Sequence, residues 1–338
     1  MPDLTVAIPV RNAGAQFAGV LTALGEQTIA HELVVCDSGS SDRSAELARA
    51  YGARVIEIAP EEFSHGATRN RLLREAHTER VALLTQDAQP VDGHWLERLL
   101  EGFELAGDVA IVYGPYRPRP DAPLPVRLEL ERWFASLADS AEPQLERLAE
   151  DERGLPVVEL VGRRGFFTDA NACIARSAWE RVPFREVAYA EDRVLAIDML
   201  RAGYAKAYVP GAAVHHSHHY SAGEQLRRSF DEWRGLLEVY GWREPASARA
   251  QLSRLRGELG QARAELGAEG LMGAGLLAAL AAVARHHVVR SAGALLGSRA
   301  DRLPAGARRR LSLEGRAGFV ALQLDGELIP TTQEPFTR

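Results

Sequence analysis

The sequence predicts an α/β protein with a largely parallel sheet over its first 115 residues, and three observations support this. Short apolar, β-branched runs alternate with segments whose apolar residues recur at helical spacing. The alternation repeats at the spacing of β–α–β units, which build parallel sheets. The composition is that of an ordinary globular protein, and 338 residues suffice for one large domain with an appended subdomain.

The expected elements of this first part follow one another in strict alternation. Five strands are expected, at 4–10, 32–37, 54–60, 80–85 and 109–115. Four helices are expected between them, at 15–27, 41–53, 66–77 and 92–107. We expect the second helix to take Ser41 as its N-cap and to end near Gly52.

The middle of the chain is less regular. The proline-rich stretch 115–125 cannot hold a helix or a central strand, so we expect residues 116–165 to be irregular, with a mobile loop around 149–156. An amphipathic helix is expected at 189–204. A short strand that ends in histidines is expected within 206–221.

After about residue 243 the chain becomes rich in Ala, Leu, Arg and Glu. Helices are expected at 246–267 and 271–297, followed by a loose end. We therefore predict three parts, which are an α/β domain at 1–242, a helical region at 243–325 and a tail at 326–338.

Charge and apolar runs bear on location and partners. Residues 1–240 carry 26 basic and 37 acidic side chains, whereas residues 241–338 carry 14 basic and 9 acidic ones. The start has no signal-peptide pattern, no apolar run is long enough to span a membrane, and the two cysteines make no disulfide framework. We expect a cytoplasmic protein with no nucleic-acid partner.

The basic C-terminal stretch 284–310 holds seven arginines against one acid, beside an apolar helix. Interfacial helices combine apolar and basic faces in this way. We hypothesise that this region docks on the inner face of an anionic membrane. A helical packing or homo-oligomerisation subdomain is the alternative.

Polar residues follow four of the expected strands. In such sheets ligands bind beyond the carboxyl ends of the strands, so these residues should converge on one edge. They lie at Arg11–Asn12, in 37–42, in 61–70 and in 85–90. Their convergence favours a site for a polar, phosphorylated ligand.

Each group also has a purely structural interpretation. Asp37 can accept hydrogen bonds from a base or ribose, or it can belong to a helix-capping loop with Ser41 and Asp42. Arg69, in a segment with His65 and Asn70, can pair with phosphate oxygens or be a solvated helix residue. Asp87 can hold a Mg²⁺ or Mn²⁺ that bridges a diphosphate, although one such acid is weak evidence.

Two further clusters suit catalysis and metal binding. Glu191 and Asp192 lie at the start of the helix 189–204. One of them can act as a general base, or both can simply interact favourably with the helix dipole. His216 and His218 share one face of an extended segment. Without a supporting Cys-x-x-Cys pair, a structural zinc site is disfavoured.

These fragments, in this order, resemble the family 2 glycosyltransferases of the GT-A fold. The resemblance covers about residues 3–235 and is nearest to the rhamnosyltransferase-like group, which builds cell-envelope polysaccharides. Its motifs are IPVRNAG, VVCDSGSSD, FSHGATRN, LLTQDAQPVDGHWL, FFTDANACIARSAW, YAEDRVLAIDMLRAGY and VPGAAVHHSHHYS.

The resemblance implies a role for each matching residue. Those that would hold the nucleotide and donor are Pro9, Val10, Asn12, Asp37, Arg69 and Gln86. Asp87 would bind the metal, completed by His216 or His218, and Asp192 would be the base with Glu191 beside it. Asp169 and Asn171 would line the acceptor or donor-sugar side. Thr85 replaces the first acid of the family's Asp-x-Asp motif, a change that recurs in the rhamnosyltransferase-like group.

The activity implied is metal-dependent, inverting transfer of a deoxyhexose. L-rhamnose from dTDP-rhamnose would pass to a hydroxyl of a cell-envelope glycan or lipid-linked acceptor. The alternatives are another nucleotide-sugar and a non-catalytic nucleotide-sugar-binding protein on the same fold. A nucleotidyltransferase is a further rival, but it would need a Gly-rich phosphate loop near the N-terminus, which the sequence lacks.

Overall fold

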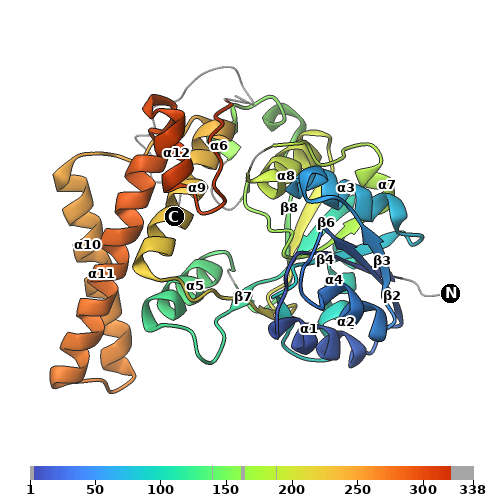
Figure 1. Ribbon diagram of the computed structural model, residues 1–338, viewed down its shortest axis with the longest axis horizontal. Helices are drawn as coiled ribbons and strands as arrows, with labels where there is room; N and C mark the ends of the chain where they lie inside the picture. The colour runs from blue at the N-terminus through green and yellow to red at the C-terminus, as the bar shows by residue number, and fades with distance from the viewer. Residues whose placement is uncertain (1–3, 139, 161–163, 188, 321–338) are drawn as a thin grey trace. The chain divides into compact units, whose positions relative to one another are not determined.

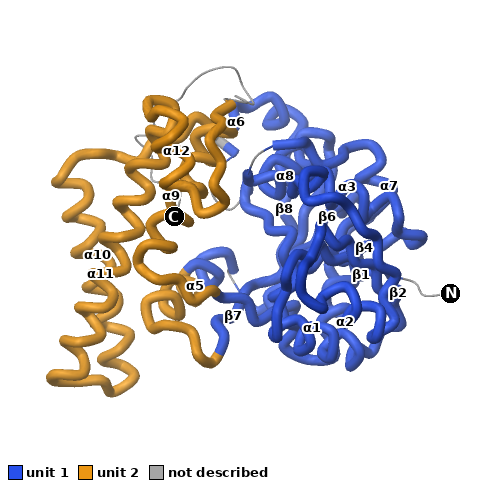
Figure 2. Tube along the Cα trace, in the orientation of Figure 1, with its two compact units in different colours: residues 1–119, 133–217 blue, residues 120–132, 218–338 orange. Residues whose placement is uncertain are grey.

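The computed structural model describes residues 4–138, 140–160, 164–187 and 189–320. The chain forms two compact units (Figure 2). Unit 1 comprises residues 1–119 and 133–217, and unit 2 comprises residues 120–132 and 218–338. The predicted domain boundary at residue 242 stays a prediction, since this division groups the helix at 222–240 with the C-terminal helices.

Unit 1 is built on an eight-stranded sheet with the strand order β3-β2-β1-β4-β9-β6-β10-β8. The strands are β1 (Leu4–Val10), β2 (His31–Asp37), β3 (Arg54–Glu57), β4 (Arg80–Leu84), β6 (Val109–Tyr113), β8 (Gln144–Glu146), β9 (Asn171–Ala175) and β10 (Ala205–Tyr208). Strands β1 to β4 run parallel, as do β6 and β10. Strand β9 is antiparallel to both of its neighbours, β4 and β6, so the sheet is mixed at its centre.

The helices of unit 1 connect these strands (Figure 1). They are α1 (Gln16–Gly25), α2 (Ser44–Ala50), α3 (His65–Glu75), α4 (Trp95–Glu101), α6 (Val157–Leu160), α7 (Arg176–Trp179) and α8 (Glu191–Arg201), with the 3₁₀ turns η1 (Pro60–Glu62), η2 (Gly102–Leu105) and η3 (Glu150–Glu152). The predicted alternation of strands and helices is present. The predicted cap of α2 is wrong, because the helix begins three residues after Ser41, whose backbone N–H and hydroxyl both donate to Asn12 Oδ1.

The region 116–165 is more regular than predicted. It holds the two-residue strand β7 (Tyr116–Arg117) and the helix α5 (Leu124–Ser136). The prolines do not prevent this helix, because Pro123 precedes it and Pro125 lies in its first turn, where the missing N–H has no partner to lose. The predicted loop at 149–156 contains η3, and its mobility stays a prediction.

A second, three-stranded sheet has the order β5-β11-β7, where β5 is Gln89–Pro90 and β11 is Val214–His215. Strand β11 pairs antiparallel with β5 and parallel with β7. The predicted single strand in 206–221 is therefore two strands, β10 and β11, separated by Pro210 and Gly211. This small sheet holds the histidine segment beside the chain that leaves β4.

The approach of this segment to β6 requires a glycine. A Cβ on Gly114 would lie 1.8 Å from the backbone oxygen of Ala212, so no larger residue fits without moving the backbone. Gly114 therefore fixes the path by which the 211–213 turn reaches β11.

Unit 2 is helical. Its elements include α9 (Ala222–Tyr240), α10 (Ala248–Ala268), α11 (Gly273–Gly297), η4 (Ala300–Arg302) and α12 (Ala305–Leu311). Helices α10 and α11 lie side by side as an antiparallel hairpin (Figure 1), and a small apolar cluster lies between them and the start of α5. Both predicted C-terminal helices are present, and the predicted tail at 326–338 lies outside the described residues.

Replacing Gly114 with Ala should lower the free energy of unfolding by about 1–3 kcal/mol or more, because the added methyl group overlaps a backbone carbonyl. Chemical denaturation would measure the change. Gly107→Ala is the matched control, since a Cβ there meets no atom within 4 Å. Equal stability of the two variants would contradict the assigned packing.

Candidate active site

The end of β2 presents a buried carboxylate. Asp37 is 3% exposed, and its Oδ1 accepts hydrogen bonds from the backbone N–H groups of Gly39 and Ser40 at 3.0 and 2.8 Å. Its Oδ2 is buried and has no hydrogen-bond partner among the described residues. Because buried polar atoms are nearly always bonded, this oxygen is available to a ligand hydroxyl or amino group.

The side-chain amides of Asn12, after β1, and Gln86, after β4, form hydrogen bonds to the backbone of the loops near Asp37. Asn12 has a left-handed backbone (φ 47°), and its Oδ1 accepts from the N–H of Ser41 at 2.7 Å. Gln86 Oε1 accepts from the N–H of Arg11 at 2.7 Å, and its Nε2 donates to the Arg11 carbonyl at 3.2 Å. These two side chains therefore shape the loops around Asp37.

The structure brings together the strand-end residues predicted to hold the nucleotide. Pro9 and Val10 end β1 in register with Cys36 and Asp37, and Asn12 and Gln86 lie just beyond. Their contact with a nucleotide stays a prediction.

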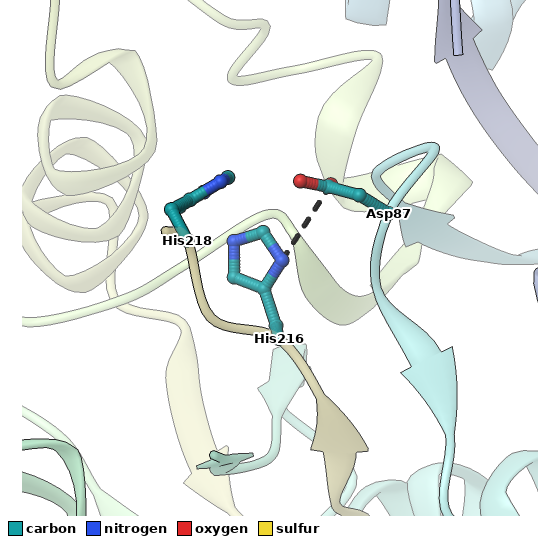
Figure 3. Close-up of side chains that lie close together, drawn as sticks. All are labelled: Asp87, His216 and His218. Atoms are coloured by element: carbon teal, nitrogen blue, oxygen red, sulfur yellow. Dashed lines mark ion pairs between the residues drawn. The ribbon is translucent and has the colours of Figure 1, made fainter. Parts of the chain in front are cut away.

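Asp87 lies close to two histidines (Figure 3). It occupies the turn after β4, in which the N–H of Ala88 donates to the carbonyl of Thr85 at 3.1 Å. Its Oδ1 is 3.5 Å from Nδ1 of His216, which directly follows β11. His218, the first residue of unit 2, is only two residues further along the same segment. One ligand atom from each of the three residues lies within 4.8 Å of the others.

This set of atoms fits a divalent cation. One carboxylate oxygen and two imidazole nitrogens suit Mn²⁺, while Mg²⁺ favours oxygen ligands. The rings of Tyr116 and His216 form a T-shaped pair with 4.7 Å between centroids, which restricts the orientation of the imidazole. His215 is turned elsewhere, with Nδ1 3.1 Å from the carbonyl of Pro118.

A second charged cluster surrounds the guanidinium of Arg69. This residue, on α3, is 4% exposed. Its Nη2 donates to Asp169 Oδ1 at 2.7 Å, its Nε forms a second close contact with the same carboxylate, and its Nη1 is 3.1 Å from Glu191 Oε1. Although burial opposes the charge, the carboxylates of Asp169 and Glu191 raise the pKa of Arg69, so the guanidinium stays charged. Burial raises the pKa of Asp169 well above its ordinary value.

Asp192 completes this cluster at the start of α8. The preceding Ala190 is left-handed (φ 60°, ψ 31°), a strained conformation for a residue with a Cβ that turns the chain into the helix. Asp192 Oδ1 accepts the N–H of Arg193 at 2.7 Å. Burial, followed by the neighbouring charge of Glu191, raises the pKa of Asp192 to about 6. A carboxylate with such a pKa is suited to take up a proton near neutral pH.

Two predicted roles look different in the structure. Arg69 was predicted beside the nucleotide, and its guanidinium instead binds two buried carboxylates, one of which is the predicted sugar-side residue Asp169. Asn171 was predicted on the acceptor or donor-sugar side, but it is completely buried. Its amide accepts from Trp95 Nε1 at 2.8 Å and donates to the carbonyls of Pro115 and Ala212. We therefore correct Asn171 to a structural link that joins α4, β9 and the turn before β11.

Tyr116 is a further residue of the site, and sequence patterns do not reveal it. Its hydroxyl is hydrogen-bonded to Thr168, next to Asp169, and its ring packs on His216, so it lies between the two clusters. The pairing of β7 with β11 places it there. A proline-rich stretch carries no local signal for that pairing.

Comparison with known proteins identifies the class. Residues 5–175 match the sequence profile of the family described as Glycosyl transferase family 2. The chain is 33% identical over 237 residues to the O-antigen chain rhamnosyltransferase WbaN of Salmonella anatum, a match that covers 68% of this chain and 71% of that one. It is 32% identical over 234 residues to the O-antigen chain rhamnosyltransferase RfbN of Salmonella typhimurium, covering 68% and 70%.

Among solved structures, the chain is similar to the mannosyltransferase PcManGT from Pyrobaculum calidifontis in complex with GDP-Man and Mn²⁺. The TM-score is 0.51 at 20% identity, and the match covers 90% of this chain and 78% of that one. At this identity the likeness bears on the fold alone.

The chain belongs to the family 2 glycosyltransferases. It is a glycosyltransferase with a GT-A fold and a helical C-terminal region, which confirms the predicted family, fold class and enzyme class. In the part of the chain that the structure describes, none of the helices combines the length and the apolar character needed to span a bilayer.

With Asp192 as the predicted base, the pH dependence of sugar transfer should show an acid limb near pH 6, because a base with this pKa is deprotonated, and active, only above it. The titratable and charged groups around Asp192 come from α8 (Glu191 and Arg193), α3 (Arg69), β7 (the neutral Tyr116) and the segment before β9 (Asp169). Replacing Glu191 with Gln removes a neighbouring negative charge and should move the limb to lower pH.

Initial rates measured across pH for the wild type and Glu191→Gln would test this. Asp198→Asn is the matched control, since it lies on the same helix but pairs with Arg185. A limb that stays in place, or moves to higher pH, in Glu191→Gln would contradict the assigned environment of Asp192.

Proposed function

We propose that this glycosyltransferase transfers L-rhamnose from dTDP-rhamnose to a hydroxyl group of a cell-envelope glycan or lipid-linked acceptor. The observation that carries the reaction type is the partly buried carboxylate of Asp192, whose pKa is raised to about 6 within the cluster around Arg69. The choice of sugar is supported by the two relatives named as O-antigen chain rhamnosyltransferases. The resemblance of the motifs associates Thr85, in place of an acid, with the same subgroup.

The donor nucleotide is proposed to lie along the ends of β1, β2 and β4. The unpaired Oδ2 of Asp37 would accept a hydrogen bond from the base or ribose. The loops held by Asn12 and Gln86 would form the walls of this site, with the backbone of Pro9 and Val10 at its floor.

Asp87 and His216, with His218, would hold the divalent cation, Mn²⁺ or Mg²⁺. When bound, such an ion offsets the negative charge that develops on a diphosphate leaving group. Tyr116 keeps the imidazole of His216 in place.

Asp192 would accept the proton of the acceptor hydroxyl. The hydroxyl oxygen forms a bond to the anomeric carbon as the bond from that carbon to the diphosphate breaks, and dTDP leaves with the electron pair. A direct displacement with one base inverts the anomeric centre. Arg69 would act as a positioning residue, because it holds Glu191 and Asp169 on either side of its guanidinium and so fixes the start of α8.

Two alternatives remain distinct from this proposal. Another nucleotide-sugar could serve as donor, since the sugar pocket is not defined by the residues above. A non-catalytic nucleotide-sugar-binding protein would need no base; the absence of the first acid at Thr85 supports it, whereas membership of the glycosyltransferase family speaks against it. We also propose a cytoplasmic protein, peripheral on the inner face of the cell membrane.

Asp192→Asn should remove rhamnose transfer, because the amide cannot accept the proton, while dTDP binding should stay within about twofold. Turnover of a panel of nucleotide-sugars and calorimetric binding of dTDP would measure the two properties. Asp198→Asn serves again as the control on the same helix. Transfer at the wild-type rate by Asp192→Asn would overturn the base assignment, and binding without turnover of any donor by the wild type would favour the non-catalytic alternative.

His216→Ala and Asp87→Asn should each weaken Mn²⁺ binding about tenfold or more, since each removes one donor atom. Electron paramagnetic resonance of free Mn²⁺ reports this directly, without an activity assay. The control is His219→Ala, a half-exposed histidine outside the three-residue set. Unchanged Mn²⁺ affinity in both site variants would exclude this cluster as the metal site.

A further inference from the structure

In the hairpin of α10 and α11, the acidic side chains are paired with arginines of α5, whereas several arginines of α10 are exposed. Its acids are Glu258, Glu265 and Glu269. Arg132 of α5 pairs with Glu258 at 2.9 Å and with Glu265 at 2.8 Å, while Arg127 pairs with Glu269 at 2.9 Å. All the negative charge of the hairpin is therefore matched by arginines of α5.

The outer face of α10 carries positive charge without such partners. Arg249, Arg256 and Arg263 are exposed, and the described residues provide no ion-pair partner for any of them. They are spaced seven residues apart, which places them within about 40° of one another around the helix. Leu252, also exposed, lies on the same face because it is three residues after Arg249 and four before Arg256.

The tip of the hairpin is apolar. Between Glu269 and Arg285 the chain has no charged residue. Met272 is 79% exposed and Leu277 is 70% exposed. Large apolar side chains this exposed in one short segment are a mark of an interaction surface.

The basic stretch 284–310 offers fewer free positive charges to an anionic partner than its composition implies. Arg290 is paired with Glu129 at 2.7 Å. Arg299 and Arg308 donate to backbone carbonyl oxygens within unit 2. These three arginines hold unit 2 together. The surface suited to an anionic partner therefore includes residues of the hairpin that precede the stretch 284–310.

We infer that the outer face of α10 and the tip of the hairpin form a docking surface for an anionic lipid bilayer. This docking surface consists of Arg249, Leu252, Arg256, Arg263, Met272 and Leu277. Lipid phosphates complement the row of guanidinium groups, and the apolar tip enters the boundary between headgroups and acyl chains. A symmetric, face-to-face contact between two copies of this surface fits less well, because the two arginine rows would repel each other.

This inference is independent of the sugar transferred. It requires neither the donor nor the base assignment, so it can fail while the proposed sugar transfer holds; it rests only on the proposed peripheral location. It adds a specific surface to the expectation of a peripheral membrane protein.

The test is sedimentation of the full chain with vesicles. The wild type should bind vesicles of phosphatidylcholine mixed with phosphatidylglycerol and bind pure phosphatidylcholine weakly, and added salt should release it. The variant Arg249→Gln/Arg256→Gln/Arg263→Gln should lower the partition constant about a hundredfold, because each arginine near an anionic surface contributes about fivefold. Restoring the charge with Lys at the three positions should restore binding.

Matched controls come from the exposed surface of unit 1. Arg43→Gln/Arg74→Gln/Arg147→Gln removes the same charge and should bind vesicles as the wild type does. Met272→Ser/Leu277→Ser should weaken binding, whereas Tyr51→Ser/Leu105→Ser should not. The four replaced apolar side chains are all exposed, so these variants should fold.

Three results would overturn the inference. The wild type could fail to bind the mixed vesicles, or the hairpin variants could bind as their controls do. Equilibrium sedimentation without lipid could also show dimers that the hairpin substitutions abolish, which would assign the surface to a second copy of the chain.

Discussion

The buried guanidinium of Arg69 is the interaction on which the proposed catalytic end of the molecule depends. It is the cation that directly contacts both Asp169 and Glu191, and it holds together α3, the segment before β9 and the start of α8. Removing it would leave buried carboxylates without their charge partner, a change that costs more than the pair itself contributes. The same contact turns Glu191 away from solvent and leaves the adjacent Asp192 as the partly exposed carboxylate. Arg69 thus stabilises unit 1 and also determines which of the two neighbouring acids is buried and which is partly exposed.

Much of the fold could be predicted because it depends on local patterns of apolar residues in the sequence. The strand–helix alternation of the first 115 residues and the two C-terminal helices follow from apolar periodicity, and both are present in the structure. Helix α5 could not be predicted from its prolines, since their effect depends on whether they fall in the first turn or later. The antiparallel insertion of β9 between β4 and β6 also has no local signal, because strand order is decided by packing over long separations.

Residues of the candidate site could be predicted where a polar side chain directly follows a strand or begins a helix. Asp37, Asp87 and Asp192 all stand at such positions, and the structure shows Asp87 beside His216. The environments of Arg69 and Asn171 could not be read from the sequence, because their partners lie about a hundred residues away in one case and in three separate segments in the other. A local motif identifies a functional residue type, whereas burial decides whether its side chain faces a ligand or the protein.

The small sheet β5-β11-β7 has a consequence for how the proposed metal site would form during folding. Asp87 and His216 are far apart in the sequence, and they meet only after β11 has paired with β5 and β7. Such long-range pairings form late and slowly during folding. In the proposed site, cation binding would therefore depend on strand pairings between segments that lie far apart in the sequence.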